Sequence, residues 1–255
     1  MIRTATPADL PALRELFGRA NDGPYELERV AEEKCFGDGI AGPPTVRIYG
    51  DFLGASVTCG KWLRILIVDR DARGRGIGSA LLGDSQATVI AAEPGNYFTP
   101  GVPENLAPFF QRRGFTEKAH TWNLHTVLAP AAQPRNCATA QPNDRILDFI
   151  EREFGRIWRF ECTRAEGIVI HEDHGVITGF AAYEANNRGL GSFGPVGVAK
   201  SMRGTGIGRD LTLAALHELH TLGYSRAVIP WTDALEFYRK VCGAEVERRF
   251  LTFTR

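Results

Sequence analysis

Two glycine-rich hexamers have the residue types and spacing best suited to chemistry in this chain. They read RGRGIG at 73–78 and RGTGIG at 203–208. Each follows an apolar, β-prone run and precedes a helical pattern, so each predicts a strand that enters a tight turn and then a helix. In such a corner the backbone N–H groups point outward together, and the helix dipole adds partial positive charge. The pattern therefore predicts a phosphate or pyrophosphate site at each hexamer.

Two common phosphate motifs do not fit the hexamers. The dinucleotide motif G-x-G-x-x-G fails because Ser79 and Arg209 stand where its third glycine would be. The motif G-x-x-x-x-G-K-[S/T] is absent from the chain. What remains is the pattern R-x-x-G-x-G, which both hexamers match.

The residues around the hexamers repeat as well. Each copy continues with a helical pattern, a short buried strand, a loop, and an amphipathic helix that ends near a glycine. Phe110 and Tyr238 occupy matching places in these last helices. Between the copies lies APAAQPRNCATAQPND, whose Pro-rich and polar composition is typical of a linker. We therefore expect an N-terminal domain at 1–129, a linker at 130–142 and a C-terminal domain at 143–255.

The elements that must position the hexamers alternate between strands and helices. In the first half we expect strands at 2–5, 45–50, 52–59, 62–68, 88–92 and 115–127, and helices at 8–19, 27–36, 76–87 and 105–113. In the second half we expect helices that start at 144 and run over 156–164, 206–222 and 234–241, and strands at 167–172, 176–184, 192–198, 225–229 and 244–254. This mixture predicts an α/β or α+β fold in layers.

Composition excludes several classes of partner. Thirty basic residues balance thirty acidic ones, so we expect no nucleic-acid partner. The five cysteines are scattered, odd in number and free of any Cys-x-x-Cys pair, which fits a reducing compartment and no zinc ribbon. The start MIRTATPADLPALREL lacks the apolar run of a signal peptide, and no window reaches the roughly 18 apolar residues of a membrane span. We expect a cytoplasmic protein that needs neither a membrane nor a metal.

The pattern R-x-x-G-x-G resembles the acetyl-coenzyme A loop of the GNAT superfamily of N-acetyltransferases. VAKSMRGTGIGRDLTLAAL is similar to that family's strand–loop–helix signature, and DALEFYRKVCGAE is similar to its later helix. Because the likeness covers most of both halves, it implies two tandem GNAT domains, each a mixed, mainly antiparallel sheet flanked by helices. A narrower likeness is to bacterial tandem glucosamine and glucosaminide N-acetyltransferases.

The resemblance implies acetyl transfer from acetyl-CoA, as co-substrate, to the amine of a small molecule. Splayed strands would free backbone N–H groups near Val198 and Val68 for the thioester carbonyl. The loop amides would hold the pyrophosphate. The implied coenzyme-binding residues are Val198, Arg203, Gly204, Thr205, Gly206, Ile207 and Gly208 in the second copy, and Val68, Arg73, Gly74, Arg75, Gly76, Ile77 and Gly78 in the first.

Tyr238 is the candidate acid for the departing CoA thiolate. A free tyrosine has a pKa of about 10 and a thiol one of about 8.5, so Tyr238 acts best as a hydrogen-bond donor that yields its proton as charge develops. The alternative is that Tyr238 only fills the core, as helix aromatics usually do. Phe110 cannot donate a proton, so we expect the N-terminal domain to be catalytically degenerate.

Glu184, at the end of an expected strand, is our first candidate for the general base, and Asp233 and His171 are weaker ones. A solvated carboxylate is the plainer alternative for Glu184. HEDH at 171–174 predicts a hairpin turn, and HELH at 217–220 lacks the further ligands of a metal site. Cys242 is expected to be packed rather than nucleophilic.

A second function of a different class stays open. Two GNAT-like modules could also form a non-catalytic protein that binds or senses acyl-CoA. The sequence does not specify the acceptor amine, and it leaves homodimer formation open.

Overall fold

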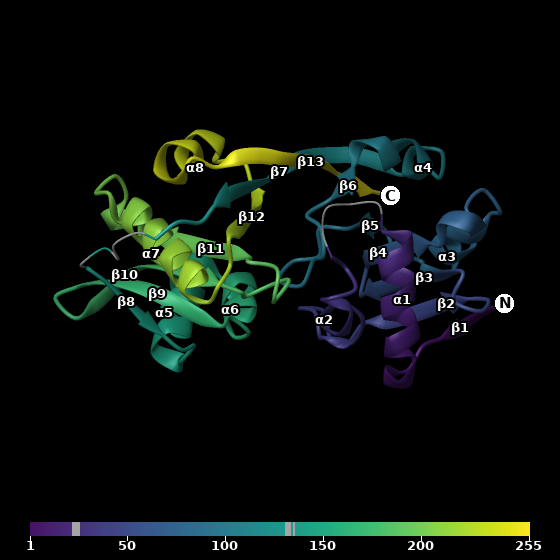
Figure 1. Cartoon of the computed structure of the whole chain (residues 1–255), viewed down its shortest axis with the longest axis horizontal. Helices are drawn as coiled ribbons and strands as arrows, with labels where there is room; N and C mark the ends of the chain where they lie inside the picture. Colours follow the sequence, from purple (N-terminus) through teal and green to yellow (C-terminus); the bar gives the residue numbers. More distant parts are fainter. Residues whose placement is uncertain (22–25, 131–133, 135) are drawn as a thin grey trace. The chain divides into compact units, whose positions relative to one another are not determined.

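The computed structural model describes residues 1–21, 26–130, 134 and 136–255, which form two compact units (Figure 1). Unit 1 consists of Met1–Thr121 and Arg249–Arg255, and unit 2 of Trp122–Arg248. Residues 131–133 and 135 of the expected linker lie outside the described residues. None of the described helices has both the length and the apolar character that crossing a bilayer requires.

Unit 1 is built on a mixed sheet. Its strands are β1 (Ile2–Thr4), β2 (Thr45–Tyr49), β3 (Gly54–Cys59), β4 (Trp62–Val68), β5 (Val89–Ile90), β6 (Val102–Pro103) and the first part of β7 (Thr116–Val127). Its helices are α1 (Leu10–Ala20), α2 (Ala31–Phe36), α3 (Ile77–Ser85) and α4 (Ala107–Gln111). Strands β1 to β4 are antiparallel neighbours, and β5 joins β4 in parallel. Helix α3 packs against β2, β3 and β4, and the glycine-rich segment at 73–76 lies between the end of β4 and the start of α3.

Unit 2 repeats this plan. Its strands are β8 (Cys137–Ala140), β9 (Gly167–Asp173), β10 (Val176–Tyr183), β11 (Phe193–Val198), β12 (Arg226–Thr232) and parts of β7 and β13 (Glu245–Thr254). Its helices are α5 (Asp144–Phe154), α6 (Arg156–Cys162), α7 (Ile207–Thr221) and α8 (Leu235–Cys242). Strands β8, β9, β10 and β11 form an antiparallel sheet, and β12 pairs with the second part of β7.

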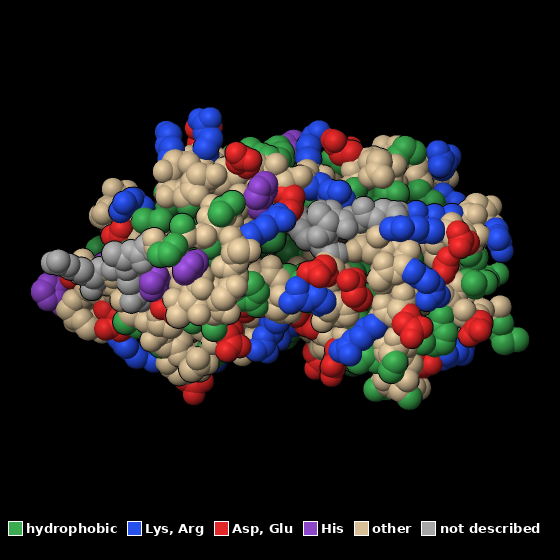
Figure 2. Space-filling model, in the orientation of Figure 1, with side chains coloured by type: hydrophobic (Ala, Val, Ile, Leu, Met, Phe, Trp, Pro, Cys, Tyr) green, Lys and Arg blue, Asp and Glu red, His purple; other side chains and the backbone are tan. Residues whose placement is uncertain are grey.

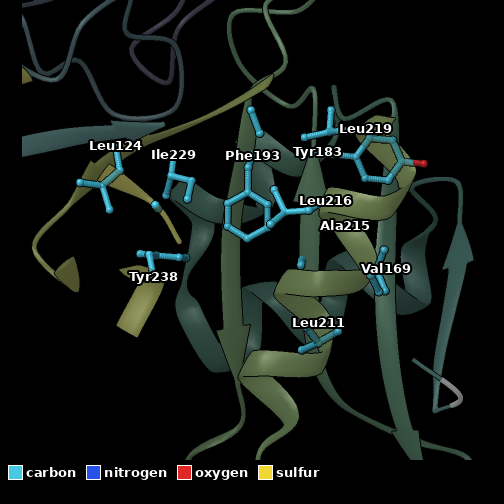
Figure 3. Packing of buried hydrophobic residues seen from close by; sticks show 14 of the residues in the cluster. Leu124, Val169, Tyr183, Phe193, Leu211, Ala215, Leu216, Leu219, Ile229 and Tyr238 are labelled. Carbon is cyan, nitrogen blue, oxygen red and sulfur yellow. The ribbon is translucent and has the colours of Figure 1, made fainter. Parts of the chain in front are cut away.

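The sheet of unit 2 is buried on both faces because its side chains alternate between two cores. On β9, Val169 packs toward α7, whereas Ile168 and Ile170 pack toward α5. On β10, Ala181 and Phe180 divide in the same way. Figure 3 shows the α7 core, in which Phe193 of β11 stands at the centre. Unit 2 is therefore a layered α/β fold, as the sequence predicts.

Several elements differ from the sequence-based expectation, since β5 covers only Val89–Ile90 of the expected strand 88–92 and α4 only Ala107–Gln111 of the expected helix 105–113. Cys137–Ala140, inside the expected linker, forms β8 and pairs with β9. The expected helix at 27–36 begins only at Ala31. A hairpin turn connects β9 and β10, but it consists of His174 and Gly175, whereas residues 171–173 of the expected turn belong to β9.

The closing strands of the two sequence repeats are exchanged between the units. Phe253 and Thr254 of β13 pair with Ile90 and Val89 of β5 in unit 1, although they follow the second repeat in sequence. Conversely, the end of β7 pairs with β12 in unit 2. The compact units therefore differ from the sequence division at 129 and 143, because the strand that closes each sheet comes from the other repeat.

Candidate functional site

The two hexamers form matching corners, and their glycines have left-handed conformations. Gly74 and Gly76 have φ values of 78° and 80°, and Gly204 and Gly206 have values of 81° and 92°. A Cβ atom at any of these four positions would meet nothing within 4 Å. Gly76 and Gly206 are also the N-cap residues that directly precede α3 and α7. The corners therefore combine a backbone that requires glycine with open space at a helix N-terminus, which fits the approach of a phosphate group.

The strand before each corner loses its parallel neighbour. In unit 1, β4 pairs with β5 only at Trp62 and Leu63, and Ala91 turns away with a φ of 53°. In unit 2, β11 and β12 meet at one isolated bridge between Ser192 and Val228. In the described part of the chain, β11 has no parallel partner from Phe193 to Val198. This divergence leaves backbone groups on one edge of the strand for a ligand, as the sequence analysis expects.

A β-bulge accompanies each divergence at the same place. In unit 1, Leu63 and Ile65 face consecutive residues of β3, so Arg64 is the extra residue. In unit 2, the register between β10 and β11 shifts by one residue between Val196 and Phe193. Because a bulge bends its strand and increases the local twist, it accounts for the separation of β4 and β11 from their parallel neighbours.

The arginine of each hexamer has a structural contact that the sequence analysis did not foresee. Arg203 Nε donates to the carbonyl of Val198 at 3.3 Å, and Arg73 Nε donates to that of Val68 at 3.2 Å. Arg73 Nη2 also donates to the carbonyl of Ala20 at 2.6 Å. The first position of R-x-x-G-x-G therefore ties the turn to the end of its own strand.

Helix α8 places aromatic side chains beside the corner of unit 2. A Cβ atom at Gly208 would lie 3.7 Å from Val198 Cγ2 and 3.8 Å from Phe237 Cζ. Tyr238 follows, with its ring 6.0 Å from that of Phe193 and 5.0 Å from that of Phe237. Figure 3 shows Tyr238, Ile229 and Leu124 on one side of Phe193.

The chemistry open to Tyr238 follows from its burial. Its side chain is 6% exposed, and burial raises the pKa of its hydroxyl well above the ordinary value. The hydroxyl has no hydrogen-bond partner among the described residues. Tyr238 is therefore protonated at neutral pH and has a donor to offer, which suits a hydrogen-bond donor and excludes a phenolate nucleophile.

The matching place in unit 1 is closed by its own side chains. Phe110 is 6% exposed and packs against Phe115 and Phe253. The guanidinium of Arg113 lies 3.7 Å from the ring centre of Phe109 and donates to Ser79, in the first turn of α3. Unit 2 has Val241 where unit 1 has Arg113, and Arg209 where unit 1 has Ser79, so it lacks the Arg113–Ser79 hydrogen bond between the two helices.

Glu184 lies at the start of the β10–β11 connection, and its backbone N–H donates to Ser192 O, where β11 and β12 begin to diverge. It is 3% exposed, and burial raises the pKa of its carboxyl against the opposing effect of several hydrogen bonds. Ser192 N donates to Oε1 at 2.6 Å, and Tyr224 Oη donates to Oε2 at 3.1 Å. Both oxygens therefore already accept hydrogen bonds from the protein.

The other candidates of the sequence analysis lie in different surroundings. His171 Nδ1 lies 2.7 Å from Thr178 Oγ1, and Asp233 is exposed just before α8. Burial raises the pKa of the Cys242 thiol, which donates to the carbonyl of Tyr238 at 3.2 Å, so packing explains it better than nucleophilic attack. His217 lies on α7, and no group of three or more His, Cys, Asp or Glu side chains in the described ranges could hold a metal ion.

A buried polar cluster in unit 1 escaped the sequence analysis. Arg64 and Glu93 form a two-fold ion pair at 2.6 and 2.8 Å, and both side chains are fully buried. Lys34, also fully buried, donates to Asn96 at 2.8 Å. No spacing signal connects these residues, since they are 29 and 62 positions apart. Arg64 of this cluster is the extra residue of the bulge in unit 1. The corresponding residue in unit 2 is Gly194, which has no side chain to form such a cluster.

Two family models match the chain, and together they cover well over half of it. The acetyltransferase (GNAT) family matches residues 135–244, and an acetyltransferase (GNAT) domain matches residues 50–123. The chain therefore belongs to the GNAT superfamily and contains two of its domains in tandem. None of the curated protein sequences matches the chain significantly.

Solved structures show the same tandem fold over the whole chain. A glucosamine N-acetyltransferase region of a fungal multi-domain β-N-acetylglucosaminidase aligns with a TM-score of 0.77 at 16% identity; the alignment covers all of this chain and 38% of the fungal one. A tandem GNAT protein from the clavulanic acid biosynthesis pathway aligns at 0.70 and 15% identity, over 100% and 98% of the two chains. A GCN5-related N-acetyltransferase from Sphaerobacter thermophilus aligns at 0.69 and 16%, over 100% and 95%. At these identities the likeness establishes the fold.

The surface adds one constraint on partners. On the face in Figure 2, basic and acidic side chains alternate rather than gather by sign. This agrees with the formal net charge of zero. The surface in view therefore offers no extended basic patch for a polyanion.

Proposed function

We propose that the protein is an N-acetyltransferase that moves the acetyl group of acetyl-CoA to a primary amine of a small molecule, and that unit 2 carries out the reaction. The observation that carries the proposal is that three features of unit 2 lie at the same strand, β11. The glycine corner, the free edge of β11 and the protonated Tyr238 all adjoin the same strand. Family membership supports acetyl-CoA as co-substrate.

The residues of unit 2 fit the coenzyme on two structural grounds. The open glycine positions at 204 and 206 would let a pyrophosphate reach the backbone N–H groups of residues 203–208. The edge of β11 near Val198 offers main-chain N–H donors suited to a thioester carbonyl and to its developing oxyanion. When bound, the coenzyme supplies an activated acetyl group and a thiolate leaving group.

The chain's own part in the reaction is to hold the reactants and to stabilise charge. The neutral amine attacks the acetyl carbon in a ternary complex, the C–N bond forms and the C–S bond breaks. The amine nitrogen loses one proton to solvent, and the departing thiolate takes up one proton to become CoA thiol. Holding both reactants together removes much of the entropic barrier of a bimolecular step. The Tyr238 hydroxyl donates a hydrogen bond toward the developing thiolate, and its raised pKa keeps the proton on the tyrosine oxygen.

The class of acceptor is the finer part of the proposal. The fungal region is named a glucosamine N-acetyltransferase, and this likeness in fold makes amino sugars the first acceptors to test. The surface of mixed charge is compatible with a small, uncharged or singly charged acceptor. Polyamines, amino acids and aminoglycosides complete the panel.

Release of CoA thiol from acetyl-CoA in the presence of each amine tests the proposal. We expect release that depends on one class of amine and that disappears in a Gly206→Val variant, because valine cannot readily adopt a φ of 92°. The matched Gly76→Val variant in unit 1 should retain release. Binding of CoA without release for any amine would favour the non-catalytic acyl-CoA-binding alternative.

A further inference from the structure

We propose that Glu184 is a positioning residue: its carboxylate holds the β10–β11 loop closed and thereby fixes the point at which β11 leaves β12. The inference rests on the proposed function, because the free edge of β11 matters only if the acyl thioester is held there. It assigns Glu184 and Tyr224 a role in the geometry of the site rather than in proton transfer.

The loop that Glu184 holds has an unusual backbone. Between β10 and β11, residues 184–192 include four with positive φ: Glu184 at 51°, Asn187 at 55°, Gly189 at 92° and Gly191 at 70°. Two of these four carry a Cβ atom, for which the left-handed region is unfavourable. Such a loop keeps one conformation only if contacts elsewhere compensate for its backbone.

The carboxylate of Glu184 provides those contacts. Oε1 accepts from Ser192 N at 2.6 Å, and Oε2 accepts from Gly189 N and from Tyr224 Oη. The backbone N–H of Gly191 contributes as well. The side chain is almost fully buried, so these bonds do not compete with water. A buried carboxylate with several donors is a strong local clamp, because each of its oxygens satisfies at least one backbone or hydroxyl donor.

The clamp acts on the last point where β11 and β12 are joined. Glu184 N donates to Ser192 O at 2.8 Å, and Ser192 is the residue that bridges to Val228. Val228 N donates to Gly191 O at 2.9 Å. The next residue, Phe193, carries the ring against which Tyr238 packs. Glu184 therefore fixes both the start of the free edge of β11 and the support of Tyr238.

In unit 1 the corresponding connection between two strands is short and has no side chain in the role of Glu184. Its β3–β4 connection is the two-residue turn Gly60–Lys61, because Cys59 and Trp62 pair directly. The carbonyl of Lys61 there accepts from Thr88 N and from Val89 N, each at 3.0 Å. A tight turn fixes its strands by itself, whereas the longer loop of unit 2 depends on a side chain.

A general base needs a lone pair that can reach the substrate ammonium. In Glu184 both oxygens are engaged inside the fold, and the side chain is 3% exposed. Tyr224 donates to Glu184 Oε2 at 3.1 Å, whereas Arg188 of the same loop pairs with Glu166 at 2.9 Å. The carboxylate thus faces donors of its own loop and of the segment after α7.

Two variants separate positioning from proton transfer. Glu184→Gln puts an NH₂ group against an N–H donor and so breaks the clamp, whereas Tyr224→Phe removes one donor and leaves the carboxylate intact. We would measure hydrogen exchange of residues 184–198 in the full chain, with and without desulfo-CoA, and the pH dependence of turnover. Tyr224→Phe is the milder change and keeps the test valid if Glu184→Gln is poorly folded.

We expect exchange of residues 184–198 to be roughly tenfold faster in Glu184→Gln, and two- to threefold faster in Tyr224→Phe, with the rest of unit 2 unchanged. The kcat should fall roughly tenfold or more in Glu184→Gln with little change in KM for the amine, and the acid limb of the pH profile should stay in place. Normal exchange together with a lost acid limb would overturn the proposal in favour of a general base. Normal exchange and normal turnover would overturn it outright. If the wild-type chain shows neither protection of residues 192–198 by desulfo-CoA nor turnover, the proposed function itself fails, while the exchange of the variants without ligand still reports on the clamp.

Discussion

Replacement of Tyr238 by phenylalanine separates the packing of this side chain from its chemistry. Phenylalanine keeps the ring contacts with Phe193 and Phe237. It removes a hydroxyl that makes no hydrogen bond to the described residues and is not fully shielded from solvent. Because this hydroxyl makes no hydrogen bond within the fold, we expect Tyr238→Phe to change the free energy of unfolding by less than about 1 kcal/mol.

The turnover number kcat, in contrast to the stability, should fall strongly in Tyr238→Phe. One preorganised hydrogen-bond donor to a developing charge contributes about 10²–10³-fold to a rate, so kcat should fall by that factor, equivalent to about 2.7–4 kcal/mol of transition-state free energy. The KM for acetyl-CoA should change less than about threefold, because the phosphate-binding amides lie at residues 203–208 and not at the hydroxyl. The assay is release of CoA thiol with the best amine of the panel, beside thermal unfolding of the same samples.

Unit 1 offers the matched control. Phe110→Tyr adds a hydroxyl at the corresponding place, between Phe115 and Phe253, where it should cost about 1–3 kcal/mol of stability and leave turnover unchanged. An unchanged kcat in Tyr238→Phe would refute the donor role. A large loss of stability in that variant would refute the inference that the hydroxyl is unpaired.

Three further predictions concern the corner, the buried ion pair and pH. Gly206→Val should weaken CoA binding at least tenfold and Gly76→Val should not, as measured by calorimetric titration; equal effects would contradict the assignment to unit 2. Glu93→Gln should lower the free energy of unfolding by about 3–5 kcal/mol, because it leaves Arg64 charged and buried without its partner, and a change below about 1 kcal/mol would contradict this. The hydrogen bond from Arg19 lowers the pKa of Asp69 in the folded state, so the stability that the wild type has over Asp69→Asn should be fully present at pH 7 and lost as the pH falls through that lowered pKa. Urea unfolding at pH 7 and pH 2.5 tests this, and an equal difference at both values would contradict it.

The parts of the site that sequence could predict are those fixed by local backbone demands. Gly74, Gly76, Gly204 and Gly206 have positive φ in the structure, and alternate glycines after an apolar run predict such a corner without any knowledge of the rest. The strong amphipathic pattern of Asp144–Phe154 predicted α5 in the same local way.

The parts that escaped prediction depend on contacts between distant residues. The strand Cys137–Ala140 is short and rich in Ala and Thr, and it exists because it pairs with β9. The strand-end position of Glu184 was predicted, but its engagement by Gly189 and Ser192 requires the loop to fold back on itself. Neither feature has a periodicity that a sequence pattern could carry.

The exchange of closing strands also could not be predicted from patterning. β7 and β13 both follow the last helix of their repeat, and each has the apolar content of a sheet strand. The residues near Phe253 contain no pattern that would favour pairing with Ile90 over pairing with a strand of the second repeat. Only the packing of the whole chain decides between the two arrangements.

This exchange has a consequence for how the protein is made. As residues 1–121 emerge from a ribosome, the neighbour that β5 requires has not yet been synthesised, since it lies at residues 249–255. The sheet of unit 1 therefore keeps one edge open until residues 249–255 have been made. A gene cut between the two repeats would yield two fragments that each lack the strand the other carries, and we expect them to be recovered as a folded pair only when both are produced together.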